Sequence, residues 1–69
     1  MNTTIIYQDE KTEESIFRQE NVTLIPNVGD IVEIEDFTYI VIQKIFTVKE
    51  DKTIVNIFTV PVHPYFGNL

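Results

Sequence analysis

The sequence predicts an all-β protein, folded as a small five-stranded antiparallel SH3-like barrel. Three observations lead to this fold class. Five segments rich in β-branched and aromatic residues are separated by short polar or Pro/Gly-containing connections, helical signals are scarce, and the 69 residues leave room for one domain only. Short connections in so small a chain favour a strongly bent sheet that closes on itself. We expect a single domain over residues 1–69, with an extended C-terminal tail from about 61 to 69.

The N-terminal part of the chain predicts two strands joined by a charged loop. β-branched and aromatic residues give 3–8 the character of a first strand. Residues 9–14 are then the loop, and a second strand is expected over about 15–25. Residues 11–20 also allow a helix, because Thr12-Glu13-Glu14-Ser15 resembles a capping pattern. Both structures stay open for this segment.

Pro26 and Gly29 mark the clearest turn in the chain, because proline lacks a backbone donor and glycine permits a positive φ. A third strand is expected over 31–35, where Val32 and Ile34 alternate with two glutamates. This alternation predicts one buried face and one solvated face.

The last two strands are expected to form a long hairpin. A tight turn at Asp36-Phe37 leads to the longest strand, over 38–48. A polar reversal at 49–52 then leads to the final strand, over 53–62. We expect Phe46 of the longer strand to lie in the core.

A pattern within about 24–60 carries a resemblance. It consists of Pro26-Asn27-Val28-Gly29-Asp30-Ile31-Val32-Glu33-Ile34, followed by Tyr39-Ile40-Val41 and Ile45-Phe46. In this pattern the chain resembles small uncharacterised proteins, encoded by bacteriophages and prophages, with an SH3-like barrel. It departs from them at Asp36-Phe37, where those proteins tend to place Asp-Gly or Asn-Gly. The resemblance implies a phage or mobile-element origin and a barrel fold, and it implies no catalytic residues.

The charge balance favours a protein partner over a nucleic acid. The chain carries 11 acidic and 5 basic residues, for a formal net charge of −6. Phosphate backbones are bound by clustered Lys and Arg, so direct nucleic-acid binding is not expected. A host protein with a basic surface fits better. A solvated acidic surface without any binding role is the plain alternative.

Composition and hydropathy favour a cytoplasmic location, and the phage resemblance implies the cytoplasm of a bacterial host. Cysteine is absent, and neither a basic segment nor a long apolar segment follows Met1. No apolar run approaches the roughly 20 residues that are needed to cross a bilayer. We therefore expect a cytoplasmic protein without a membrane partner.

The sequence holds too few reactive side chains for an enzyme. Its only serine, Ser15, and its only histidine, His63, have no frame that would bring them together with a carboxylate. With one histidine and no cysteine, no metal and no cofactor are expected. The carboxylates around the third strand offer one alternative, a hard-cation site, although a solvated strand face explains them better.

Two acidic clusters form the candidate partner-binding surface. They lie in the first loop and around the third strand, and their members are Glu13, Glu14, Asp30, Glu33, Glu35 and Asp36. They predict a negative surface that docks on a basic groove, and the phage resemblance suggests inhibition of a host defence protein. Two alternatives stay open: a self-associating structural or assembly accessory of the virion, and an oligomeric sponge that sequesters a signalling nucleotide.

The C-terminal segment predicts self-association. From Thr53 onward the chain has no Asp, Glu, Lys or Arg, so it lacks the charges that normally protect an exposed strand edge. We expect a homodimer or a higher homo-oligomer held together by apolar and aromatic residues, namely Phe37, His63, Tyr65, Phe66 and Leu69. A tail that folds back as a plug over the barrel mouth is equally compatible with the sequence, and both arrangements stay open.

Overall fold

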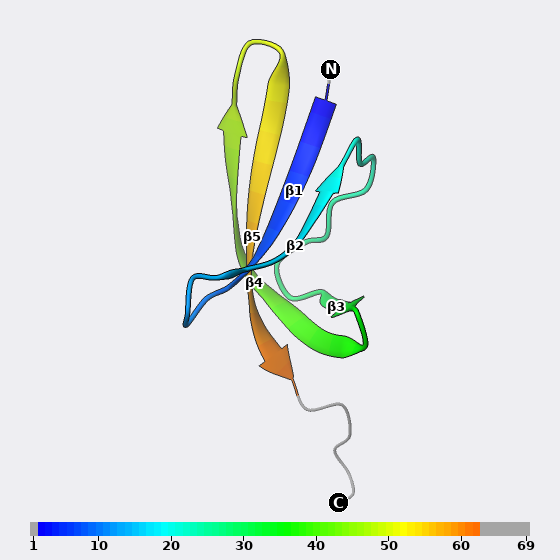
Figure 1. Ribbon diagram of the computed structural model, residues 1–69, viewed down its shortest axis with the longest axis vertical. Helices are drawn as coiled ribbons and strands as arrows, with labels where there is room; N and C mark the ends of the chain where they lie inside the picture. The colour runs from blue at the N-terminus through cyan, green and yellow to red at the C-terminus, as the bar shows by residue number, and fades with distance from the viewer. Residues whose placement is uncertain (1, 63–69) are drawn as a thin grey trace, which may run out of the picture.

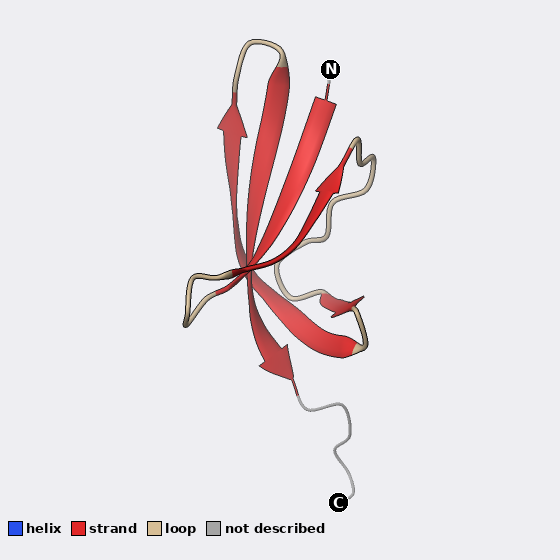
Figure 2. Ribbon diagram, in the orientation of Figure 1, coloured by secondary structure: helices blue, strands red, loops and turns tan. Residues whose placement is uncertain are grey.

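The computed structural model describes residues 2–62, which form one five-stranded sheet and no helix (Figure 1, Figure 2). The strands are β1 (Asn2–Asp9), β2 (Ser15–Glu20), β3 (Ile31–Ile34), β4 (Phe37–Val48) and β5 (Lys52–Val62). Their order across the sheet is β2-β1-β5-β4-β3. The prediction of an all-β protein is confirmed. Within residues 2–62 there is no helix that is long and apolar enough to cross a membrane.

The sheet is mixed. Its other strand pairs are antiparallel, but β1 and β5 run parallel, with Ile5 beside Val55 and Tyr7 beside Ile57. The expectation of a purely antiparallel sheet is therefore wrong. Alternation along a strand predicts which side chains are buried, but it does not give the direction of the neighbouring strand. Here the long β2–β3 connection, residues 21–30, carries the chain to the far edge, and β5 returns between β4 and β1 (Figure 1).

The sheet curls into a half-barrel whose edge strands, β2 and β3, are not paired with each other. The pairing register shifts between Tyr7 and Gln8 in β1 and between Val41 and Gln43 in β4. Such irregularities bend a strand and increase its local twist. β4 and β5 pass through the middle of the molecule and continue into its lower half (Figure 1).

The concave face of the half-barrel holds the hydrophobic core, whose buried side chains are Ile5, Tyr7, Ile34, Val41, Val55 and Ile57. Full burial of one such side chain is worth roughly 1.5–3 kcal/mol, so this set supplies much of the domain's stability. The loop of residues 21–30 contributes Val22 and Ile25 to the packing around this core. The Gly29 N–H donates a hydrogen bond to the Val41 carbonyl oxygen (2.8 Å), which fastens the end of the loop to β4.

The segment that allowed either a helix or a strand forms a hairpin loop followed by a strand. The Asp9 carboxylate accepts hydrogen bonds from the backbone N–H groups of Lys11 (2.8 Å) and Thr12 (3.2 Å). Such local bonds favour a turn over a helix. β2 is shorter than expected, because Asn21 has a φ of 57° and leaves the strand conformation directly after Glu20.

A two-residue turn joins β3 to β4 one position earlier than predicted. Ile34 pairs with Phe37, so the turn consists of Glu35 and Asp36. Both turn residues have a positive φ, 51° and 76°, which is the signature of a type I′ turn. This turn type matches the twist of the flanking strands, but at residues other than glycine it stores backbone strain.

Only the first part of β4 has a neighbour on both sides. β3 pairs with residues 37–40, whereas β5 accompanies β4 as far as Val48. Beyond Val41, residues 42–48 form an open border of the sheet, which we call the free border of β4 (Figure 1). Phe46 lies in this border and is 50% exposed, so the prediction that it is a core residue is wrong.

Candidate binding site

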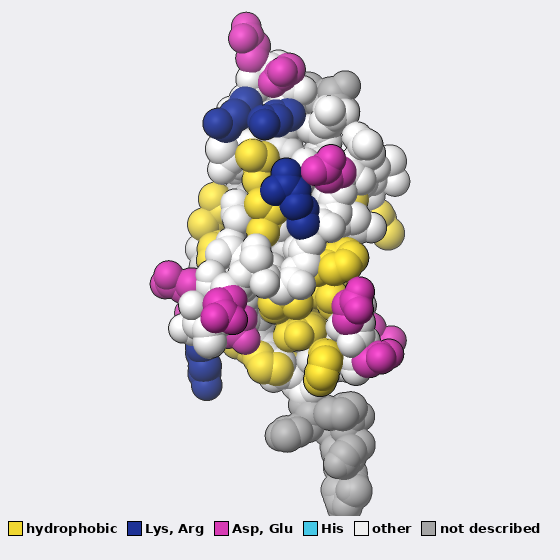
Figure 3. Space-filling view, viewed as in Figure 1, with side chains coloured by type: hydrophobic (Ala, Val, Ile, Leu, Met, Phe, Trp, Pro, Cys, Tyr) yellow, Lys and Arg dark blue, Asp and Glu magenta, His cyan; other side chains and the backbone are white. Residues whose placement is uncertain are grey.

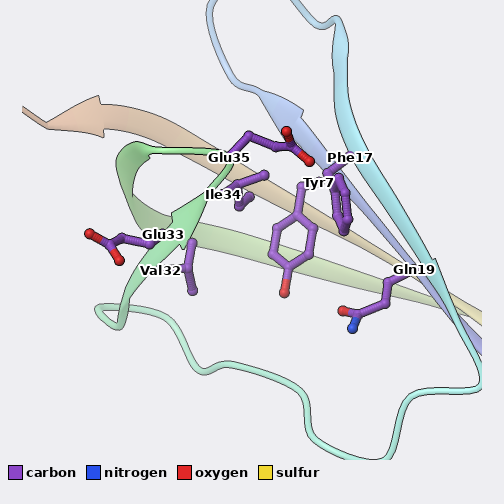
Figure 4. Close-up of a pocket in the computed structure, with 7 residues that line it drawn as sticks. All are labelled: Tyr7, Phe17, Gln19, Val32, Glu33, Ile34 and Glu35. Carbon is purple, nitrogen blue, oxygen red and sulfur yellow. The ribbon is translucent and has the colours of Figure 1, made fainter.

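A cavity of about 400 Å³ lies between the two edge strands, β2 and β3, which are not paired with each other. We call it the seam cavity; the residues that line it are Tyr7, Phe17, Gln19, Val32, Glu33, Ile34 and Glu35 (Figure 4). One wall comes from β2 and the other from β3, while β1 contributes Tyr7 between them. The seam cavity is therefore where the half-barrel remains unclosed.

Strand register places the apolar lining of the seam cavity. Tyr7 pairs with Phe17 of β2 and with Ile57 of β5, so these side chains share the concave face. The rings of Tyr7 and Phe17 lie next to each other in Figure 4. On β3, alternation brings Val32 and Ile34 to the same interior side, as the sequence predicted.

Among the described residues, the Tyr7 hydroxyl has no hydrogen-bond partner. None of the side-chain hydrogen bonds within residues 2–62 involves this hydroxyl. Because no buried side-chain oxygen or nitrogen in this part of the chain lacks a partner, the hydroxyl must reach the cavity space. Burial raises the pKa of Tyr7 above its usual value of 10.0, so the hydroxyl stays protonated at neutral pH. It can donate a hydrogen bond to a ligand.

A second cavity, of about 440 Å³, adjoins the first and shares Tyr7 and Val32 with it. Its other lining residues come from the loop of residues 21–30 and from the start of β3. Leu24 and Ile31 are strongly exposed there, at 84% and 57%. The two cavities thus form a partly apolar surface along β3.

Acidic side chains surround β3. The carboxylate of Glu35 extends toward Phe17, whereas Glu33 points away from Tyr7 (Figure 4). Asp30 lines the second cavity, and its carboxylate accepts a hydrogen bond from the Asn27 N–H (2.7 Å). Among the described residues, no Lys or Arg lines either cavity. The electrostatic potential at this surface therefore favours a cation.

The two predicted acidic clusters do not lie together. Asp30, Glu33, Glu35 and Asp36 gather around β3, but Glu13 and Glu14 belong to the β1–β2 loop. Figure 1 shows this loop and the β3–β4 turn on opposite sides of the lower half, and acidic side chains occupy both sides in Figure 3. Within residues 2–62, no group of three or more His, Cys, Asp or Glu side chains is placed to hold a metal ion.

The predicted self-association residues are described only in part. Phe37 is 65% exposed at the start of β4. His63, Tyr65, Phe66 and Leu69 lie outside the described residues, and so does any pairing of His63 with Ser15.

Sequence reasoning missed the residues that β1 and β2 contribute to the seam cavity. Tyr7 stands in an ordinary β-rich run, and Phe17 and Gln19 follow a loop whose structure was open. Only the pairing register of β1 with β2 shows that Phe17 lies beside Tyr7. No local sequence signal carries that register.

No relative supplies a function for this site. Comparison of the chain with protein-family models, with curated proteins and with solved structures finds no match.

Proposed function

We propose that the protein is a non-enzymatic binding domain that takes up an extended, basic segment of a protein partner between β2 and β3. The observation that carries this proposal is the seam cavity, a space with aromatic and aliphatic side chains beside carboxylates, bordered by two unpaired strand edges. The proposal keeps the predicted basic partner and moves the centre of recognition to β3 and the cavity beside it.

Both edges of the seam offer backbone hydrogen bonds. An edge strand presents a row of N–H and C=O groups that a further strand can pair with, and extended peptides bind many sheets in this way. Alternate side chains of such a peptide point to one face. In the seam they would meet the rings of Tyr7 and Phe17, and the added strand would occupy the gap in the half-barrel.

The chemistry of the lining selects for basic side chains. The long stem of an Arg or Lys packs on aromatic rings while its charged end seeks a carboxylate. Phe17 and Tyr7 offer the rings, and Glu35 offers the nearest carboxylate in view (Figure 4). The remaining acidic residues around β3 would accelerate the encounter more than they would tighten the complex.

The experiment is a titration with two fluorescent peptides, followed by fluorescence anisotropy. One peptide alternates arginine with valine, and the other alternates glutamate with valine. Only the basic peptide is expected to bind. Glu35→Gln should lower its affinity about two- to fivefold, the effect of losing one exposed ion pair.

Glu50→Gln is the matched control. Glu50 is exposed in the β4–β5 turn, far from the seam cavity, and the substitution changes the net charge by the same amount. Equal affinities of the two variants for the basic peptide, or tight binding of the acidic peptide, would contradict the proposal.

Three finer predictions from the sequence remain proposals: an SH3-like assignment for the half-barrel, a phage origin, and a host defence protein as the partner. Five strands with a strongly bent β4 support the first. The carboxylates around β3 support a basic partner, without distinguishing one host protein from another. A pull-down from host lysate with mass spectrometry tests the last of these, and recovery of virion proteins instead would favour the assembly role.

A further inference from the structure

The free border of β4 combines an unpaired strand edge with exposed apolar side chains. Ile42 is 38% exposed, Ile45 45%, Phe46 50% and Val48 74%. Within residues 2–62, no backbone group beyond Val41 bonds across this border. Soluble proteins normally shield such an edge with charges, proline or a covering loop, because it is a template for further strand pairing. In Figure 3, hydrophobic side chains follow this border on the left of the upper half.

Lys44 is the only charged residue in the free border, and its side chain contacts other residues of its own chain. Its Nζ donates a hydrogen bond to the Asn27 side-chain oxygen (3.1 Å) in the loop of residues 21–30. The same Nζ lies 5.6 Å from the centre of the Phe46 ring, within the range of a cation–π contact. The ammonium group is thus held by its own chain and does not shield the strand edge from pairing with another strand.

We propose that a second copy of this chain pairs antiparallel with the free border of β4, so that the two half-barrels share one continuous sheet. Antiparallel pairing of identical segments has two-fold symmetry and closes at a dimer. The register that uses all of residues 42–48 places Ile45 opposite Ile45 of the second copy. Lys44 then lies opposite Phe46 of the second copy, so no two lysines face each other and each ammonium group has an aromatic neighbour.

The distribution of charge favours the free border over the rest of the surface as the contact between two copies. The chain has a net charge of −6, so two copies repel each other over most of their surfaces. The free border carries one basic residue and no acidic residue, which makes it the place where this repulsion is weakest. Its apolar side chains are also self-complementary, because the segment would bury them against the same residues of the other copy.

Sedimentation velocity over the micromolar range provides the first test. We expect the wild-type protein to be a dimer and Ile45→Lys to be a monomer, because this substitution places two like charges opposite each other. Val28→Lys is the matched control. Val28 is 58% exposed in the loop of residues 21–30, the charge change is identical, and the variant should remain a dimer.

Cysteine cross-linking provides a second test that does not depend on a destabilising charge. The natural chain has no cysteine, so Ile45→Cys creates a unique reporter. Opposed residues of antiparallel strands have Cα atoms about 4.5–5.5 Å apart, within the range of about 4.4–6.8 Å that a disulfide spans. Mild oxidation should give a covalent dimer of Ile45→Cys on a non-reducing gel and none of Val28→Cys.

A wild-type protein that stays monomeric at all these concentrations would overturn the proposal. A dimer that persists in a folded Ile45→Lys variant would also overturn it and would assign the contact to another surface, such as the predicted tail residues. If circular dichroism shows that Ile45→Lys is unfolded, Ile45→Cys decides: a folded, dimeric variant that does not cross-link excludes this register.

Discussion

The sheet has two unpaired borders, and they differ in what lies behind the backbone. At the seam, β2 and β3 border a cavity lined by Tyr7, whose hydroxyl has no partner within residues 2–62, and carboxylates lie around it. At the free border of β4 no acidic residue is present, and exposed apolar side chains follow one another along a single strand. Both borders offer the same kind of backbone hydrogen bonds.

In the two proposals, side chains select the partner of an open edge, because both edges offer the same backbone hydrogen-bonding groups. The acidic surroundings of the seam favour a basic segment and repel a second copy of a chain with a net charge of −6. The free border carries no acidic residue, so the repulsion between copies is weakest there and we expect it to pair with the same segment of another copy. The sharpest experiments are those that change one border and leave the other intact.

The largest effect is expected from removing the support that both borders share. Ile57 is fully buried between Tyr7 of β1 and Lys44 of β4. Ile57→Ala should cost about 2–5 kcal/mol of unfolding free energy, comparable with the roughly 3–5 kcal/mol that so small a core supplies. The variant should be largely unfolded by circular dichroism, with peptide binding and self-association both lost.

Val28→Ala is the control for this experiment. Val28 is 58% exposed in the loop of residues 21–30, and truncating it should change the unfolding free energy by no more than about 0.5 kcal/mol. If Ile57→Ala unfolds at the same urea concentration as the wild type, the concave core is not the common support of the two borders.

A smaller effect, with opposite signs for stability and for binding, is expected at the β3–β4 turn. Glu35 and Asp36 hold positive φ values that asparagine and glycine adopt more easily. The double substitution Glu35→Asn and Asp36→Gly should therefore raise the unfolding free energy by about 1 kcal/mol. It should also lower the affinity for the basic peptide several-fold, because two carboxylates beside the seam are lost. The dimer should be unchanged.

Urea unfolding, peptide titration and sedimentation on this one variant measure its stability, its peptide affinity and its dimerisation separately. Unchanged peptide affinity would show that the carboxylates of the turn do not contribute to recognition. A loss of stability would show that these backbone angles are not strained in the native turn.

The sequence predicted the parts of the fold that depend on local patterns. Alternation at Val32 and Ile34 indicated an inward face, and the polar run at 49–52 indicated a hairpin. Both are found: Val32 packs against the core, Ile34 is buried within it, and Lys49 N–H donates to the Lys52 carbonyl oxygen (2.8 Å). These features arise from residues close in the chain, so a single sequence carries them.

Features that depend on distant pairings were missed. Nothing in the run from Thr53 shows that it lies parallel to β1, and nothing in β4 shows that its border beyond Val41 has no strand partner within residues 2–62. The exposure of Phe46 follows from that open border, and the seam cavity follows from the lack of pairing between β2 and β3. The acidic residues of the site were visible in the sequence because charge needs no register, whereas Tyr7 and Phe17 were not.

Tyr7→Phe should produce a smaller effect that is confined to the seam. The substitution keeps the ring in the core and removes only the hydroxyl that reaches the cavity. We expect about a two- to fivefold loss of basic-peptide affinity, typical of one neutral hydrogen bond, and unchanged self-association. Affinities equal to those of the wild type would exclude the hydroxyl from recognition.

The same variant gives a pH test of the site. Burial raises the folded-state pKa of Tyr7 above 10.0, so the folded state disfavours ionisation. The stability of the wild type should therefore be complete below pH 10.0 and should decline as the pH rises through that value toward the raised pKa. Urea unfolding should show a smaller decline for Tyr7→Phe over this range; identical declines would mean that Tyr7 ionises as easily folded as unfolded.

The smallest effect requires no mutation. Salt should weaken peptide binding at the seam and should not weaken dimerisation at the free border of β4. Ion pairs with exposed carboxylates weaken as the screening length falls from about 10 Å at 0.1 M salt to about 3 Å at 1 M. The affinity for the basic peptide should therefore fall a few-fold over this range.

Association through the free border of β4 rests on apolar burial and backbone bonds. Salt also reduces the repulsion between two chains of charge −6, so the dimer should persist or tighten. Peptide titrations and sedimentation at the two salt concentrations measure both responses on the same sample. A dimer that dissociates in salt as readily as the peptide does would mean that charge governs both borders, and the distinction between them would fail.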